Sequence, residues 1–359
     1  MTESGTASAS QTSNDHGFGG TPDRQRRLTA YAEATWSVQR GASEWLVGAA
    51  WQHDELRARD ASALDYTFDV PAVIARHTWT PVRWFATQTS ARCDAHNVYG
   101  FSCSPRVSAL WKPVGSWHTR LSLGIANFAP TPLTDESDAI GLGRIDAAAV
   151  TAEHARSASL DVGGSPLGVE LNLTLAYSRI ENPVLGVPVV VGGVSKLRYV
   201  NAPGPAETKA IEFFASRSWG PWHATAIYGY LDGISFDPAD SVTKAATLVP
   251  RHAIGGGIGY EPATGGLVTI DAFYTGEQPL AADPYRSKSV PYTLVCILWV
   301  QPIRGGLELW LNGENLLNVK QTLYDPLLLP APDALGRRTT QVWGPLEGRV
   351  VNLGLRFKW

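Results

Sequence analysis

Hydrophobic and polar residues alternate strictly at the end of the last stretch of the chain, Leu346 to Trp359, from Val351 onward. Alternation with a period of two places one set of side chains on one face of an extended strand and the other set on the opposite face. A strand that is apolar toward lipid, polar toward a lumen and aromatic at its end is typical of a membrane-spanning β-barrel. The apolar set consists of Val351, Leu353, Leu355, Phe357 and Trp359.

The same alternation recurs along the whole chain and predicts about 15 strands. It is clearest in segments 117–128 and 267–275, where aliphatic and polar residues alternate. The connections between the predicted strands are alternately tight turns and long loops, among them 129–149, 181–205 and 318–345. Outer-membrane barrels have short turns at the periplasmic rim and long loops outside. We therefore predict an all-β fold, an antiparallel transmembrane β-barrel with its long loops at one rim.

The composition agrees with this class and excludes others. Of the 359 residues 18% are charged and the net charge is −3, which gives no electrostatic footprint for a nucleic-acid partner. No run of about 18 apolar residues is present, so a membrane-spanning helix is excluded by length. The 13 tryptophans and 12 tyrosines suit the aromatic girdles of a barrel in outer-membrane lipid. A soluble β protein is left as an alternative.

The first 25 residues differ from the rest in composition. They are rich in Ser, Thr, Gly and Asp and have no apolar central region, so we find no signal peptide in them. We predict a flexible polar segment over residues 1–25, followed by the barrel portion over residues 26–359. The expected location, the outer membrane of a Gram-negative cell, then has no export address in this chain.

Two of the three cysteines lie at the two ends of one predicted hairpin. Cys93 and Cys103 flank the segment DAHNVYGFS, and a hairpin would bring them close together. They form a disulfide if the loop lies outside the cytoplasm, or they are two small unpaired residues at strand ends. Cys296 falls within a predicted strand and is expected to be a packing residue.

The C-terminal region carries a recognisable motif. Gly313–Asn318 (GENLLN) is followed by a long loop, by Pro345–Arg349 (PLEGR) and by the aromatic terminal strand. This combination resembles the end of a TonB-dependent outer-membrane receptor, and the resemblance covers nearly everything after about residue 26. The signature residues are Glu314, Asn315, Asn318, Gly348 and Arg349.

The resemblance implies a plugged barrel of about 22 strands that actively imports a scarce nutrient. A ferric siderophore or similar metal chelate is the expected ligand, and the TonB complex supplies energy through the plug. With about 15 predicted strands, the plug and about seven strands are missing, which indicates a C-terminal fragment that needs them as partners. Both terminal strands are predicted to run toward the periplasm, so closure of the chain on itself would require a parallel pair.

Two groups of polar residues are candidates for ligand contact. Inward-facing strand residues such as Arg120, Glu170, Asp271 and Glu308 either line the path or simply face a wet lumen, and we favour the second interpretation. Residues of the outer loops offer cationic and aromatic groups suited to an anionic chelate, although they could equally hold the loops together. These loop residues are Tyr285, Arg286, Arg337, Arg338 and Trp343.

Other functions find little support in the sequence. No motif provides a nucleophile with a base and an orienting group, so we predict that the protein is not an enzyme. The eight histidines show no ligand spacing, so neither a metal site nor a cofactor is expected. A passive porin would share the alternation, but the GENLLN region and the very long loops favour a receptor. The apolar face of the terminal strand also suits a recognition signal for outer-membrane assembly.

Overall fold

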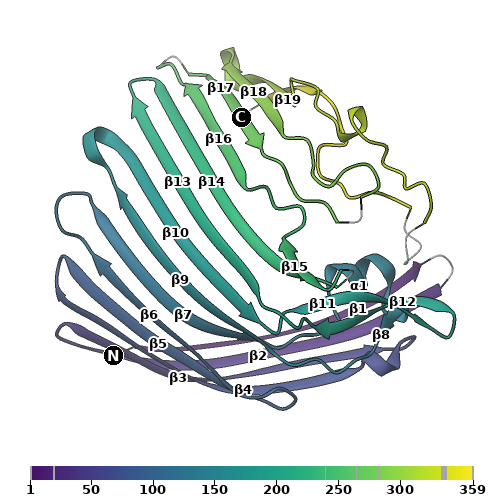
Figure 1. Ribbon diagram of the computed structural model, residues 1–359. Helices are drawn as coiled ribbons and strands as arrows, with labels where there is room; N and C mark the ends of the chain where they lie inside the picture. Colours follow the sequence, from purple (N-terminus) through teal and green to yellow (C-terminus); the bar gives the residue numbers. More distant parts are fainter. Residues whose placement is uncertain are drawn as a thin grey trace.

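The computed structural model describes residues 2–18, 21–238, 240–263, 265–281, 283–332 and 338–357. One strongly curved antiparallel sheet dominates these residues and forms the wall of an incomplete cylinder (Figure 1). Seventeen strands belong to this sheet, and one of them, β15 (Val242–Ala245), is a short branch on the end of β14. The remaining sixteen strands form the wall and pair with one another in chain order.

The wall strands are β1 (Thr2–Phe18), β2 (Thr21–Arg40), β3 (Ser43–Ala58), β4 (Tyr66–Val82), β5 (Phe85–His96), β6 (Gly100–Trp111), β7 (His118–Phe128), β9 (Glu153–Gly164), β10 (Val169–Glu181), β13 (Ala206–Trp219), β14 (Trp222–Asp237), β16 (His252–Tyr260), β17 (Leu267–Thr275), β18 (Tyr292–Pro302), β19 (Leu307–Glu314) and β20 (Val350–Phe357). The predicted all-β antiparallel architecture is confirmed, and each of the predicted strands corresponds to one of the strands from β2 onward.

The prediction of a flexible segment over residues 1–25 is wrong for the part that the structure describes. Residues 2–18 form β1, which pairs with β2 at every position from Thr2, opposite Ser37, to Phe18, opposite Thr21. The strand is built mainly from small and polar residues, so its two faces differ little in hydropathy. The sequence therefore shows no clear period-two alternation over this strand. Its backbone still completes the hydrogen bonds that the edge of β2 would otherwise lack.

The extra strand also corrects the expectation about closure. An antiparallel wall of sixteen strands has first and last strands of opposite direction, so the predicted parallel pair does not arise. In the described part of the chain β1 pairs with β2 alone and β20 with β19 alone. The wall therefore has two edges, and bringing them together would form an ordinary antiparallel pair.

The outward face of the wall is a continuous apolar belt. Aliphatic residues lie side by side across neighbouring strands, as Leu309 and Leu355 do on β19 and β20. Leu353 is 68% exposed, an exposure that only a lipid environment makes favourable for so many neighbouring aliphatic groups. Exposed tryptophans follow the rim that carries the short turns, namely Trp45, Trp79, Trp84, Trp111, Trp219 and Trp222.

The connections divide between the two rims as predicted. Short turns such as 41–42 and 220–221 join strands at one rim, and the long segments 129–152, 182–205 and the described parts of 315–349 lie at the other (Figure 1). No helix in the described part of the chain has the length and hydropathy to cross a membrane.

Two of the long segments fold together over the outer mouth, and we call them the lid. The lid comprises residues 129–152 and 182–205, with α1 (Asp135–Ile140), β8 (Ile145–Asp146), β11 (Val184–Val191) and β12 (Val194–Asn201). Its apolar residues pack on the inner face of β3, which buries Leu56 completely. The Leu142 amide donates to Asp23 of β2 over 3.1 Å, so the lid from β7–β13 is fastened to the N-terminal part of the wall. The buried cluster contains Leu56, Ala58, Leu64, Leu142, Ile145, Leu197 and Tyr199.

Candidate functional site

A cavity of about 640 Å³ lies between the lid and the inner face of the wall. Strands β2, β3 and β5 supply its charged residues, and lid residues such as Ala129, Thr131 and Thr151 line the opposite side. This volume lies within the roughly 300–1,000 Å³ range of small-molecule sites. The cavity is therefore the candidate site of the molecule, which we call the lid cavity.

Two ion pairs occupy the wall of the lid cavity. Arg27 donates through Nε and Nη2 to the two oxygens of Asp54, over 2.9 and 2.7 Å, and Asp54 is 5% exposed. Arg92 Nε donates to Asp94 Oδ1 over 2.8 Å. Both pairs lie on inward positions, because Asp54 is opposite Phe68 and Asp94 is opposite Ala72 in the strand register. The Arg27–Asp54 pair is bidentate, a geometry that fixes both partners in place.

Aromatic rings form the outer end of the lid cavity. Phe68 lies edge-on to His96 and Tyr99, with ring centroids 4.7 and 5.9 Å apart. The Nδ1 atom of His96 accepts hydrogen bonds from the amides of Val98 and Tyr99, over 3.0 and 3.3 Å. An accepting Nδ1 means that the neutral ring carries its proton on Nε2, which leaves that nitrogen as a donor. Burial raises the pKa of the Tyr99 hydroxyl, which donates to Pro130 of the lid over 2.8 Å.

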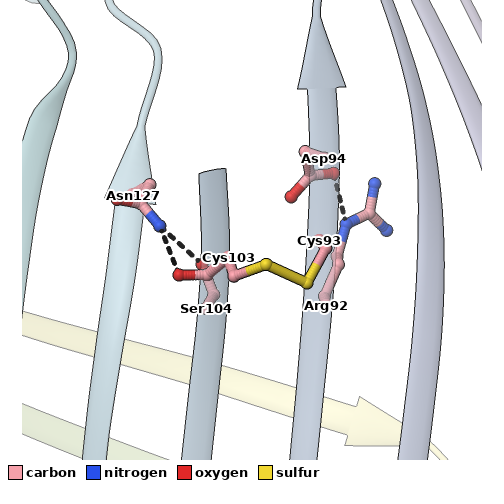
Figure 2. Close-up of a disulfide and its surroundings, with 6 residues drawn as sticks. All are labelled: Arg92, Cys93, Asp94, Cys103, Ser104 and Asn127. Atoms are coloured by element: carbon pink, nitrogen blue, oxygen red, sulfur yellow. Dashed lines mark hydrogen bonds and ion pairs between the residues drawn. A yellow bond between two sulfur atoms is a disulfide. The ribbon is translucent and has the colours of Figure 1, made fainter. Parts of the chain in front are cut away.

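Cys93 of β5 and Cys103 of β6, each next in the sequence to a residue that lines this cavity, form a disulfide with their Cα atoms 4.1 Å apart (Figure 2). Beyond Arg106 strand β6 no longer pairs with β7, and Pro105 has no amide hydrogen to donate. Asn127 of β7 bridges the gap instead, because its Nδ2 donates to the Cys103 carbonyl over 2.9 Å (Figure 2). The disulfide and Asn127 thus hold the end of β6 where ladder hydrogen bonds are missing.

Removing the disulfide should loosen this end of β6. For the double variant Cys93→Ser and Cys103→Ser we expect a loss of about 1–2 kcal/mol in local stability, at or below the low end of typical disulfides because β5 and β6 stay paired. Hydrogen exchange of the 97–105 segment measures it, with Cys296→Ser as the control for a cysteine outside the bridge. Equal protection of the bridged and unbridged proteins would contradict the expectation.

The outer rim carries one exposed ion pair with a clear pH signature. Arg24 donates to both carboxylate oxygens of Asp60, over 3.0 and 2.7 Å, and its amide donates as well over 2.8 Å. The hydrogen bonds from Arg24 lower the pKa of Asp60 from 3.8 to about 2. Since the pKa is lower in the folded state, the contact stabilises the loop fully above pH 3.8 and is lost as the pH falls toward 2.

An NMR titration of the Asp60 carboxyl carbon tests this expectation. In the Arg24→Ala variant the pKa of Asp60 should return toward 3.8, and the acid sensitivity of the loop should move up with it. An unchanged titration curve in that variant would show that other groups set the pKa.

Most of the loop residues predicted to contact a ligand instead form contacts between two outer loops. Arg286 Nε lies 2.5 Å from Asp325 Oδ2, and this pairing raises the pKa of Arg286. The guanidinium carbon lies 5.8 Å from the ring centre of Trp343, which is only 3% exposed. The Tyr285 hydroxyl donates to the Leu328 carbonyl over 2.9 Å. These contacts fit the alternative that the sequence left open, in which the residues hold the loops together.

The two remaining residues of that set differ in their placement. Arg338 is exposed at the surface. Its main-chain carbonyl accepts the Leu329 amide over 2.8 Å. Arg337 lies outside the described residues. Of the described members of the set, Arg338 is the one best placed to meet a ligand from outside.

The C-terminal signature forms a clasp between the end of β19 and the start of β20. Asn315, at a positive φ of 48°, donates through Nδ2 to the carbonyls of Val319 and Glu347 over 2.7 and 3.1 Å. Arg349 donates to the Leu316 carbonyl through both Nε and Nη2, over 2.9 and 2.6 Å. A Cβ on Gly348 would lie 2.3 Å from Asn318 Oδ1, so only glycine fits there. Glu314 lies at the edge of the clasp and accepts from Asn312 over 2.6 Å.

The comparison with known families decides what this barrel is. A sequence model of the family described as TonB dependent receptor-like, beta-barrel, matches residues 3–302. The chain belongs to this family. The family is one of outer-membrane β-barrels that act as receptors and transporters rather than as enzymes.

Solved structures of receptor barrels share the fold. The FrpB iron transporter from Neisseria meningitidis gives a TM-score of 0.75 at 16% identity, over 98% of this chain and 59% of that one. A mutant of the ferric enterobactin receptor PfeA from Pseudomonas aeruginosa gives 0.75 at 14% identity, over 98% and 59%. The copper transporter OprC gives 0.71 at 14% identity, over 94% and 57%. Identities this low show the fold alone, and the chain spans 59% of the length of FrpB. No curated protein sequence matches the chain.

Within this receptor barrel the predicted inward-facing residues lie on the lumen side. Glu308 is opposite Arg356 in the β19–β20 register, and their side chains lie 3.3 Å apart. Arg120 is opposite Asp161, and both lie nearer to the short-turn rim than the residues of the lid cavity do. Among the described residues no group of three or more His, Cys, Asp or Glu residues is arranged to hold a metal ion.

Sequence reasoning missed the residues of the lid cavity. One signal was available, because Arg92 and Asp94 are two positions apart and must share a strand face. The other contributors, Arg27 and Asp54, lie on different strands, and the register that brings them together is invisible without coordinates. The lid itself could not be predicted, since loop packing depends on contacts between distant segments.

Proposed function

We propose that this barrel forms the wall of an outer-membrane importer for a scarce nutrient, with a ferric siderophore or a similar metal chelate as the expected cargo. The observation that carries the proposal is a lid folded over a lumen-side cavity in a barrel of the TonB-dependent receptor family. A lid fastened by Asp23 suits capture of a ligand from outside better than it suits free diffusion through an open pore. The FrpB iron transporter, the ferric enterobactin receptor PfeA and the copper transporter OprC are named for iron, ferric enterobactin and copper, which supports a metal or metal chelate as the cargo.

The division of work in this importer follows from the two faces of the wall. The apolar belt holds the barrel in lipid, and the polar inner face gives the ligand a wet path. The energy for passage comes from the TonB complex, acting through a plug in the lumen, so plug and TonB complex are the proposed partners. The lid cavity then serves as a first binding place above that plug.

Uptake by living cells tests the proposal. Cells that carry or lack the gene, each with or without a functional TonB, receive a panel of radioactive iron chelates. We expect uptake of at least one chelate to require both the gene and TonB. Uptake that requires the gene but persists without TonB would indicate a passive porin, and uptake independent of the gene for every chelate would remove the transport proposal.

We also propose that the outward residues of β20 serve as an assembly signal. Val351, Leu353, Leu355 and Phe357 lie exposed on an edge strand, where an assembly factor can reach them. Trp359, the last member of the set, lies outside the described residues. Deletion of Trp359 should reduce the amount of barrel inserted into the membrane severalfold, while the inserted fraction unfolds at nearly the same temperature. Equal losses in insertion and thermal stability would indicate lipid contact alone.

A further inference from the structure

The charges of the lid cavity are already balanced by the protein itself. Arg27 and Arg92 each have a carboxylate partner within 2.9 Å, in Asp54 and Asp94 respectively. An anionic ligand that approaches either guanidinium also approaches the carboxylate bound to it. Because Asp54 is almost fully buried, the repulsion there is poorly screened by water. The cavity therefore disfavours a charged group of either sign.

The same pairs offer donors and acceptors side by side. A hydroxyl group accepts from an arginine N–H and donates to an aspartate oxygen at the same time, whereas a carboxylate or an ammonium group can do only one of these. The Nε2–H of His96 adds a neutral donor, fixed by the two backbone hydrogen bonds at Nδ1. Ser102 and Asn127 add further polar groups to the lining.

The aromatic residues give the cavity an apolar surface beside these polar groups. Phe68, His96 and Tyr99 are held at the edges of one another, with His96 and Tyr99 4.9 Å apart. Phe101 and Phe128 line the same cavity where β6 and β7 separate. A ligand that matches this arrangement is a ring with an apolar face and hydroxyl groups on its perimeter.

We propose that the lid cavity binds an uncharged, polyhydroxylated ring of the saccharide class. The inference rests on the proposed function, since the cavity lies on the outer side of the import path. It narrows the substrate to a free saccharide or to a larger chelate that carries such a ring. In either source the ring is held between the ion pairs of Arg27 and Arg92, with the lid on its other side.

Two matched probes test the charge argument on the whole protein, purified in detergent. Methyl glucoside and methyl glucuronide differ by one carboxylate, and their dissociation constants are measured by calorimetry. We expect the glucoside, or a short neutral oligosaccharide such as maltotriose, to bind at least tenfold more tightly than its acidic counterpart. Tighter binding of the glucuronide, or no binding of any neutral saccharide at millimolar concentration, would overturn the proposal.

Variants locate the binding in the cavity. Asp94→Asn leaves Arg92 without its carboxylate, so it should raise the Kd of the neutral probe about tenfold and reduce the preference over the glucuronide. Arg92→Gln should also weaken the neutral probe, and Arg92→Lys should restore part of the binding. Arg76, which pairs with Glu44 over 3.0 Å on the same inner wall outside the cavity, provides the control Arg76→Gln. Equal effects of Arg76→Gln and Arg92→Gln would place the ligand elsewhere.

Folding is checked for each variant by heat-modifiable migration on gels, a property of intact barrels. An iron chelate with and without a glycosyl ring separates the two sources, because only the glycosylated form should compete with maltotriose. Absence of saccharide binding together with TonB-dependent uptake would contradict the saccharide proposal and leave the transport proposal unaffected. Saccharide binding without any TonB-dependent uptake would support the saccharide proposal and contradict the transport proposal.

Discussion

Replacing Gln321 by alanine should release the outer loop between β19 and β20, at a local cost of about 3–5 kcal/mol. Gln321 is fully buried, and its side chain acts as a substitute strand partner for the loop. Its Nε2 donates to the Gln341 carbonyl over 2.8 Å, and its Oε1 accepts the amides of Trp343 and Gly344 over 2.9 and 3.2 Å. The variant leaves one carbonyl and two amides without partners in a region that excludes water.

Hydrogen exchange of the segment 338–349 measures this effect. The amides of Trp343 and Gly344 should lose most of their protection, and a protease should cut the loop sooner. Gln301→Ala is the matched control, because Gln301 is exposed at the opposite rim. Retained protection at Trp343 would show that Arg286 and Asp325 are sufficient to hold the loop.

The second large effect is expected at the clasp. Asn315→Ala removes three side-chain hydrogen bonds, to Val319 twice and to Glu347, and leaves a non-glycine residue without polar support at a positive φ. We expect a loss of about 2–4 kcal/mol, because both the hydrogen bonds and the backbone conformation contribute. Urea unfolding in micelles and the fraction of β20 protected from exchange give the magnitude.

Asn182 separates the two contributions to that loss. It also has a positive φ, of 54°, and it takes part in a hydrogen bond through its main-chain carbonyl, which accepts from Asn201. Asn182→Ala therefore changes the backbone preference and keeps this contact, so we expect about 1 kcal/mol. Losses of similar size in the two variants would mean that the side-chain contacts of Asn315 contribute little.

The strands from β2 onward could be predicted because lipid imposes a strict rule on the sequence. Leu353 and Leu355 must face outward and Asn352 inward, so the alternation is strong and the strand boundaries follow. Strand β1 was not predicted, because small residues such as Gly5 and Ala7 fill its outward positions and differ little in hydropathy from serine and threonine. The closure argument failed with it, since one missed strand reverses the direction of the first edge.

The functional residues were less predictable than the wall. Trp343 and Arg286 were predicted either to contact a ligand or to hold the loops together, because a loop sequence does not say which residues are turned inward. Asp325 determines the position of Arg286, and it lies 39 positions away in the chain. The C-terminal signature was recognisable as a pattern, whereas its role as a clasp required the positions of Asn318 and Gly348 in space.

The opposite directions of β1 and β20 limit how such a wall can change its circumference. Strand β1 begins at the short-turn rim, and β20 reaches the same rim at its last described residue, Phe357. An even number of further strands between these two edges would keep every neighbouring pair antiparallel, whereas an odd number would force a parallel contact. The circumference of a closed antiparallel wall can therefore grow or shrink only in steps of two strands.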